Sequence, residues 1–280
     1  MNFELSEEQR MIQQSVERFV EDNYDLNSRV ALSSKSPGFS TENWHSMAEL
    51  GWLGLPFEEE DGGFGGNQID VLVVMEQFGR GLVLEPYLAS IVMGGGALKR
   101  GGTDALKSEI LPQVIEGTLQ LAFAYAEEQS RFDLDDVMTS ARKEGENFVL
   151  NGQKSMVQNA ETADKIVVSA RTSNGQVSPQ GITLFLIDAD AEGLSQDNFP
   201  TVDGLRASEI TLENVSVGPD RILGEVDQGF SILQSVANDA MLALSAEAVG
   251  AMEVLYKDTV DYTQQREQFD HPLSEFQVLQ

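Results

Sequence analysis

The side chains that most often perform catalysis are scarce in this chain, and this limits the chemistry it can carry. Its 280 residues include no cysteine, so disulfides, thiolate catalysis and cysteine-ligated zinc are excluded. The two histidines, His45 and His271, lie far apart and form neither a paired metal-binding motif nor part of an evident Ser-His-Asp set. We expect both to be surface or helix-end residues, and the sequence predicts no metal site.

A glycine-rich segment is the next feature with a chemical interpretation, because such loops can bind phosphate groups. Residues 53–66 combine Pro56, an acidic run at 58–61 and, after that run, the four glycines Gly62, Gly63, Gly65 and Gly66. No Lys-Ser/Thr pair follows these glycines, and no βαβ pattern with a downstream ribose-binding acid surrounds them. The glycines therefore favour turns with positive φ over a phosphate site.

The elements that must position any site are helical in the first third of the chain. Ser6 and Gln9 form a capping-box pattern, and apolar residues at helical spacing follow them. Pro86 is suited to the first turn of a fourth helix, and Pro112 interrupts or bends a fifth. The other predicted helices cover residues 41–51, 67–80 and 104–116.

The pattern changes near Leu119 to a period of about two with frequent turn signals. The Asn151-Gly152 pair predicts a hairpin turn between two short strands, and a kink is expected near Asn214. Lys154, on the second of those strands, is predicted to be a structural surface residue. The predicted strands cover residues 121–125, 148–150, 154–157, 166–170, 182–187 and 209–217.

After Gly229 the apolar spacing is compatible with one long helix through about Gln265, followed by a turn at 270–272 and a new helix from Ser274. We therefore predict an α+β fold with three parts. These are an N-terminal helical domain (1–119), a middle β-barrel or sandwich domain (120–227) and the start of a C-terminal helical bundle (228–280). The bundle is expected to be incomplete, because the last predicted helix has nothing after it to pack on.

Charge and hydropathy limit the classes of molecule that this chain is expected to bind. Acidic residues outnumber basic ones 46 to 18, for a formal charge of -28. Such a surface repels nucleic-acid backbones and anionic membranes. The acidic N-terminus lacks an apolar signal-peptide core, and the apolar runs are too short to span a bilayer. We expect a soluble, cytoplasmic protein that binds no nucleic acid and does not insert into membranes.

The order of helices, strands and helices, together with several short motifs, resembles the acyl-CoA dehydrogenase family over the whole chain. The most specific stretch is 266–277, which is similar to the family signature R-x-x-F-G-x-P-I-x-x-F-Q. Residues 51–56, 61–66, 150–154 and 181–188 match further family motifs. Within the family, segments 85–88 and 246–252 look most like the small subunits of pimeloyl-CoA dehydrogenases. They are also similar to chains of bacterial steroid breakdown. Relative to the family, this chain is expected to be truncated at its C-terminus.

The resemblance implies FAD as cofactor and a fatty-acyl, dicarboxyl or steroid side-chain acyl-CoA as substrate. The implied reaction is α,β-dehydrogenation, in which a carboxylate removes the α-proton and a hydride leaves the β-carbon for the flavin. An electron-transfer flavoprotein is the implied electron acceptor, and a homo- or hetero-oligomer is the implied assembly. Such chemistry requires a positioned base, donors for the developing enolate oxygen and exclusion of water.

Two segments are carried over from the family as flavin-facing. In the first, 125–133, the family pattern E-P-x-A-G-S-D survives only at Glu127 and Asp133, and Phe132 replaces a serine. In the second, Met156 can pack on the ring as a soft apolar surface, and Gln158 can donate through its amide. The residues expected to bind the flavin are Tyr125, Ala126, Glu127, Phe132, Asp133, Met156, Val157 and Gln158.

The resemblance assigns a third group of residues to a different contact: in the family, the matching residues bind the pyrophosphate end of an FAD held by a neighbouring subunit. Arg266 and Gln277 have the family's eleven-residue spacing, and Phe269 is expected to cap the same site. A guanidinium suits this role because its planar fork can donate two hydrogen bonds to one phosphate. If this holds, the protein must be an oligomer. The alternative for Arg266 is a helix-end salt bridge.

The catalytic base stays unassigned. Family members place a glutamate either beyond the residues present here or on the long helix, where counting back from Arg266 gives Ala240. Asp239 is a poor substitute, since one helical residue turns a side chain by about 100°. Glu247 is expected to make a helix contact.

This gap leaves an alternative function of another class, a non-catalytic partner subunit that completes an FAD site on a different chain. A flavin monooxygenase on the same fold is a third hypothesis.

Overall fold

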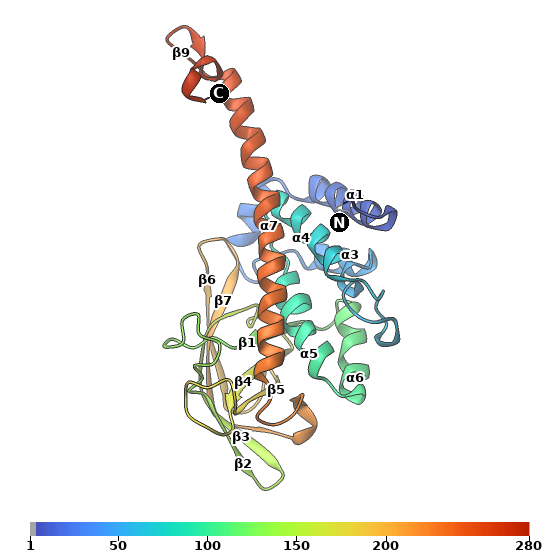
Figure 1. Cartoon of the computed structure of the whole chain (residues 1–280), viewed down its shortest axis with the longest axis vertical. Helices are drawn as coiled ribbons and strands as arrows, with labels where there is room; N and C mark the ends of the chain where they lie inside the picture. Colours follow the sequence, from blue (N-terminus) through green and yellow to red (C-terminus); the bar gives the residue numbers. More distant parts are fainter. Residues whose placement is uncertain (1–3, 280) are drawn as a thin grey trace.

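The computed structural model describes residues 4–279, and in it one long helix lies between a group of helices and a β-sheet. This layering follows the predicted order, in which helices come first, strands second and a long helix last (Figure 1). The helices are α1 (Glu7–Asn23), α2 (Leu26–Ser33), α3 (Thr41–Glu49), α4 (Gln68–Gly81), α5 (Gly96–Gly101), α6 (Asp104–Ile115) and α7 (Phe230–Gln265).

The N-terminal helices begin where side chains can accept from free backbone N–H groups. The capping box of Ser6 and Gln9 is confirmed at the start of α1, and Asn67 with Asp70 forms another at the start of α4. The fourth helix, predicted to have Pro86 in its first turn, is a π-helical segment, Tyr87–Gly95, which continues directly into α5. Helix α2 was not predicted, because this short helix has no buried residue and therefore no apolar stripe.

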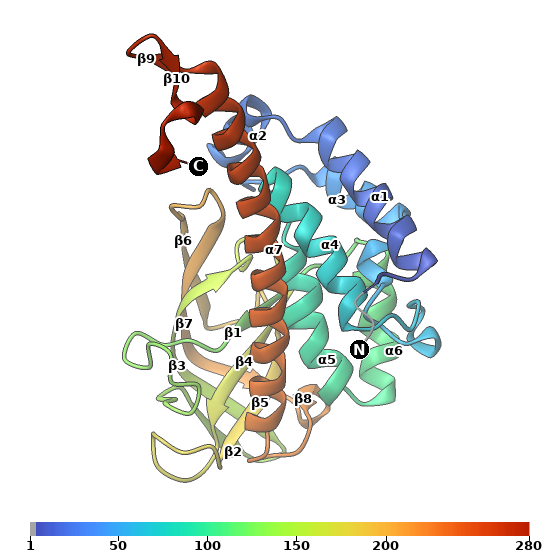
Figure 2. The same ribbon diagram turned by 45° about the horizontal axis from the view of Figure 1, so that its top comes forward.

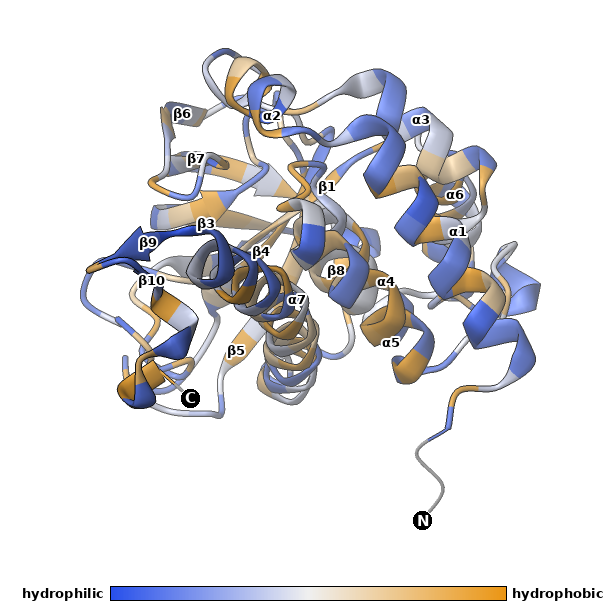
Figure 3. Cartoon of the chain, turned by 90° about the horizontal axis from the view of Figure 1, so that it is seen from above, coloured by the Kyte–Doolittle hydropathy of each residue, from blue (hydrophilic) through white to orange (hydrophobic). Residues whose placement is uncertain are grey.

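Eight strands of the middle region form one sheet in the order β6-β7-β3-β2-β4-β5-β8, with β1 pairing parallel to β4. Strands β4 and β5 are mostly buried, and hydrophobic segments of β5 are visible beside α7 in Figure 3. The polar strand β6 was not predicted. The bounds are β1 (Leu121–Ala124), β2 (Ser140–Glu144), β3 (Asn147–Gln158), β4 (Lys165–Arg171), β5 (Ile182–Asp188), β6 (Leu194–Pro200), β7 (Arg206–Val217) and β8 (Ile222–Leu223).

The predicted hairpin turn at Asn151-Gly152 is wrong. These residues lie inside the continuous strand β3, where the pairing with β7 shifts register. The side chain of Asn151 accepts a hydrogen bond from the backbone N–H of Asn214, which has the positive φ of 57° at the predicted kink. The pair is therefore part of a bulge between two long strands. The turn itself lies at Gly145, between β2 and β3.

Helix α7 runs the length of the molecule between α4 and the sheet (Figures 1 and 2). Its backbone approaches that of α4 so closely that a Cβ at Gly79 would overlap the carbonyl of Glu247, and one at Gly250 would overlap that of Glu76. Small residues are required at both crossings. The last turns of α7 project beyond the sheet and carry exposed apolar side chains, among them Leu255 and Tyr262.

The segment after α7 differs from prediction. Strands β9 (Glu267–Gln268) and β10 (His271–Pro272) pair around the expected turn. The helix predicted from Ser274 is wrong, since the chain forms only single turns at Leu273–Glu275 and Gln277–Leu279. The apolar side chains of Val278 and Leu279 are exposed here, and burial is what stabilises most short helices. Across residues 4–279, no helix combines the length and apolar character that a membrane crossing requires.

Replacing Gly250 with alanine tests the close crossing of α4 and α7. We expect Gly250→Ala to lower the free energy of unfolding by about 1–3 kcal/mol, because overpacking outweighs the gain in helix propensity. The neighbouring exposed Val249 is the control, and Val249→Ala should change stability by less than about 0.5 kcal/mol. Denaturant unfolding measures both, and an unchanged or raised stability in Gly250→Ala would contradict the packing described.

Candidate functional site

The two segments expected to face the flavin lie side by side. The first, 125–133, leaves the sheet after β1, and the second, 156–158, ends β3. The backbone N–H of Ser155 donates to the carbonyl of Ala126 at 2.9 Å. The ammonium of Lys154 also reaches the carbonyl of Tyr125 at 3.4 Å. These bonds fix the loop after β1 against the end of β3.

A buried ion pair anchors this junction. Lys154 Nζ lies 2.8 Å from Glu127 Oε1, and both side chains are almost completely buried. Glu127 also accepts from the backbone N–H groups of Met138 and Thr139, at 2.7 and 3.0 Å. Burial lowers the pKa of Lys154 to about 8, although the carboxylate of Glu127 opposes this shift. The prediction that Lys154 is a surface residue is therefore wrong, and Glu127 serves the loop's structure.

The side chains on these segments differ in exposure in a way that suits a planar, partly apolar ligand. Phe132 is 96% exposed and Met156 is 54% exposed. Val157 is buried in the sheet, whereas Asp133 is exposed. Gln158 lines the cavity described next. These side chains are compatible with a flavin, because exposed apolar groups would be able to cover its ring and Gln158 would offer an amide donor.

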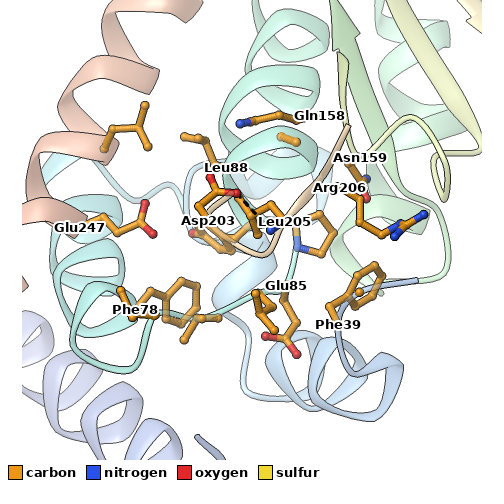
Figure 4. A pocket seen from close by; sticks show the side chains of 18 of the residues that line it. Phe39, Phe78, Glu85, Leu88, Gln158, Asn159, Asp203, Leu205, Arg206 and Glu247 are labelled. Carbon is orange, nitrogen blue, oxygen red and sulfur yellow. Dashed lines mark hydrogen bonds between the residues drawn. The ribbon is translucent and has the colours of Figure 1, made fainter. Parts of the chain in front are cut away.

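A cavity of about 350 Å³ lies where α4, α7 and the sheet meet. Its walls are mostly apolar, and Figure 4 shows Gln158 from the end of β3 and Glu247 from α7 among its lining side chains. This cavity was not predicted from the sequence, because its lining comes from five separated stretches of the chain. Apolar lining residues include Phe39, Phe78, Leu88, Leu205, Leu244 and Ala248.

The cavity also receives charged side chains. Arg206 is paired with Glu161, so these two compensate each other. Burial raises the pKa of Glu85 to about 7, and this carboxyl accepts hydrogen bonds from the Tyr24 hydroxyl and the Ser40 N–H. A carboxyl with such a pKa is partly protonated near neutral pH.

The long helix offers no base at the position that the resemblance indicates. Ala240 is buried on α7, and the adjacent Asp239 pairs with Arg100 on α5. Asp239 is therefore engaged in a salt bridge. Glu247 has its backbone at the crossing with α4, as expected, but its carboxylate belongs to the cavity.

Arg266, Phe269 and Gln277 lie far from the flavin-facing segments of the same chain. All three are exposed, beyond the end of α7. Arg266 is about 39 Å along the helix from Ala240, at 1.5 Å per residue. Among the described residues, Arg266 has no salt-bridge partner. Within one chain, Arg266, Phe269 and Gln277 therefore do not meet the two flavin-facing segments, 125–133 and 156–158.

Comparison with known proteins agrees with this architecture. The N-terminal, middle and C-terminal domains of acyl-CoA dehydrogenases match residues 6–118, 122–215 and 227–280. The probable acyl-CoA dehydrogenase YngJ of Bacillus subtilis (strain 168) is 30% identical over 285 aligned positions, covering 100% of this chain and 74% of YngJ. The chain belongs to the acyl-CoA dehydrogenase family. Members of this family are oxidoreductases that use FAD.

Other relatives show the range of the family. The 3-(aryl)acrylate reductase of Clostridium sporogenes (strain ATCC 15579) is 33% identical, over 88% of this chain and 66% of its own length. The structure of PigA with FAD and proline superposes with a TM-score of 0.90 at 27% identity, covering 99% of this chain and 74% of PigA. An acyl-CoA dehydrogenase from Geobacillus kaustophilus also gives a TM-score of 0.90, at 26% identity, covering 100% and 74% of the two chains.

The raised pKa of Glu85 predicts a pH-dependent stability that Glu85→Gln removes. Between its ordinary pKa of 4.5 and about 7, the folded state keeps a proton that the unfolded state releases. Wild-type stability relative to the variant should therefore fall as pH rises through this window, by on the order of 3 kcal/mol. Denaturant midpoints of both proteins at pH 5 and pH 8 measure this, and parallel changes in the two proteins would contradict it.

Proposed function

We propose that this chain carries the flavin- and acyl-binding part of an acyl-CoA dehydrogenase that removes hydrogens from the α- and β-carbons of an acyl thioester. The observation that supports this most directly is the cavity shared by Gln158 and helices α4 and α7. It joins the proposed flavin-facing segment to an apolar space for an acyl chain. The chain covers 74% of YngJ and 66% of the reductase, so the activity of a whole enzyme is itself a proposal.

In this proposal the chain's own residues bind and orient both ligands. The chemistry supplied by a bound FAD would be that of an acceptor for the hydride of the β-carbon. Phe132 and Met156 cover the ring, Gln158 donates through its amide, and Tyr125, Ala126, Glu127, Asp133 and Val157 shape the surrounding loop and strand. The apolar walls hold the acyl group and exclude water, which favours proton removal at the α-carbon. The residue that takes this proton is not assigned.

The cavity favours a largely apolar acyl group among the three substrate types that the resemblance implies. Its one lining cation, Arg206, is engaged by Glu161, so a carboxylate at the end of a dicarboxyl substrate finds no free partner there. A fatty-acyl or steroid side-chain thioester fits these walls better. Within the family, the proposed lineage of this chain is that of the small subunits of pimeloyl-CoA dehydrogenases.

The proposed partners are an electron-transfer flavoprotein and further subunits. One relative is the subunit CarC of a caffeyl-CoA reductase-Etf complex from Acetobacterium woodii, 29% identical over 98% of this chain and 73% of CarC. The exposed position of Arg266, Phe269 and Gln277 supports an assembly in which they bind the FAD of a neighbouring subunit. The absence of a carboxylate at Ala240 favours the second function, a non-catalytic partner subunit.

Anaerobic titration separates the two functions. If the chain is catalytic, the purified FAD-loaded protein should lose its flavin absorbance near 450 nm when a saturated acyl-CoA is added, because the ring is reduced. The matching enoyl-CoA is the control and should leave the absorbance unchanged. Protein that binds flavin only after mixing with a second family chain, and is bleached only then, would instead establish the partner-subunit function.

Replacing Arg266 tests the cofactor site between subunits. We expect Arg266→Ala to lower FAD occupancy at least tenfold on dilution, since removing a charge-assisted phosphate contact costs about 1.5–3 kcal/mol. Arg142, exposed on β2, is the matched control and Arg142→Ala should retain FAD. Flavin content is measured by absorbance after gel filtration. Equal retention in the two variants argues against the pyrophosphate role.

A further inference from the structure

Glu247 is a half-buried carboxylate that lines the mainly apolar cavity and has no ion-pair partner among the described residues. Figure 4 shows its side chain extending from α7 into the space between Phe78 and Asp203. Within residues 4–279 it makes no hydrogen bond or salt bridge. Burial, together with the nearby charge of Asp203, raises its pKa. A charged group held in apolar surroundings without a counter-ion is unfavourable, and a ligand of opposite charge removes that cost.

The other charged groups around the cavity do not supply that counter-ion. Arg206 is paired with Glu161, as described above. Arg29 lies near Glu247 and partly offsets its charge, but it is outside the lining and donates to the backbone carbonyls of Leu82 and Asp203, at 2.7 and 2.6 Å. Asp203 Oδ1 accepts from the N–H of Leu205 at 3.1 Å and adds a second negative charge.

The place of Glu247 on α7 separates it from the reacting carbons. It lies seven residues after Ala240, which is about two turns and therefore the same side of the helix, about 10 Å further along. The resemblance assigns the region of Ala240 to the α-carbon. A group that contacts Glu247 therefore belongs to the far end of an acyl chain a few carbons long.

We propose that Glu247 is a specificity-determining residue that binds a positively charged nitrogen at the far end of the acyl group. This rests on the proposed function, since it assumes that the cavity receives an acyl thioester. Glu247 forms the ion pair, Asp203 strengthens the negative potential, and Phe78 offers an aromatic surface that also attracts cations. A carboxylate-ended acyl group is repelled from the same place.

Three thioesters of similar size test the charge preference. They are 4-(trimethylammonio)butanoyl-CoA, its uncharged isostere 5,5-dimethylhexanoyl-CoA, and glutaryl-CoA, whose acyl end is anionic. Calorimetric titration of the FAD-loaded chain gives the three dissociation constants without depending on turnover. We expect the cationic thioester to bind at least tenfold more tightly than the isostere, and glutaryl-CoA to bind most weakly.

Two variants assign the preference to Glu247. Glu247→Gln should reduce the advantage of the cationic thioester to less than threefold and leave affinity for the isostere unchanged. Glu253→Gln is the matched control, because it removes the same charge from α7 at a residue paired with Arg80 and Lys257 outside the cavity. This control should keep the full preference.

The outcomes separate this inference from the function on which it rests. If the isostere binds as tightly as the cationic thioester, or if Glu247→Gln keeps the preference, the inference fails while the proposed function stands. If none of the three thioesters binds, both fail. If Glu247→Gln abolishes turnover of every thioester and leaves all three affinities unchanged, Glu247 acts at the reacting carbon, and the specificity role is overturned.

Discussion

The close approach of α4 and α7 determines where everything else in this protein can lie. Gly79 and Gly250 let the two backbones touch, and this contact sets the position of α7 between the helices and the sheet. A helix held this close presents Leu244, Glu247 and Ala248 to the cavity, opposite Phe78 from α4. Wider separation would move apart the apolar walls that the two helices contribute to the cavity.

The second constraint is the buried ion pair of Lys154 and Glu127. Ionised groups without water are tolerated only when their hydrogen-bonding capacity is met, and here backbone N–H groups and Ser169 complete the set. The pair ties the loop after β1 to the end of β3, so the proposed flavin-facing segments share one surface. The family motif at Glu127 therefore reflects the structure of the loop more than contact with a ligand.

Charge is the proposed basis of selectivity in the cavity. Most of the chain's excess negative charge is spread over solvated surface, where it has little specific effect. In the cavity the same charge meets a low dielectric, and the electrostatic effect of a single carboxylate is larger. Burial raises the pKa of Glu85, whose carboxyl also accepts hydrogen bonds from Tyr24 and Ser40, whereas no such partner of Glu247 is found among the described residues. The two glutamates thus have different roles within one space.

The sequence by itself determined what depends on neighbours along the chain. Caps such as Ser6, the period of α7 and the apolar runs of β4 and β5 predicted those elements, and motifs such as residues 266–277 predicted the family. It failed where distant contacts overrule local preference. The Asn151-Gly152 pair forms a bulge, where Asn151 accepts a hydrogen bond from Asn214 on β7, and not a turn. Lys154 is buried because it forms an ion pair with Glu127. Only the tertiary structure revealed the cavity, because its walls come from residues that periodicity cannot bring together.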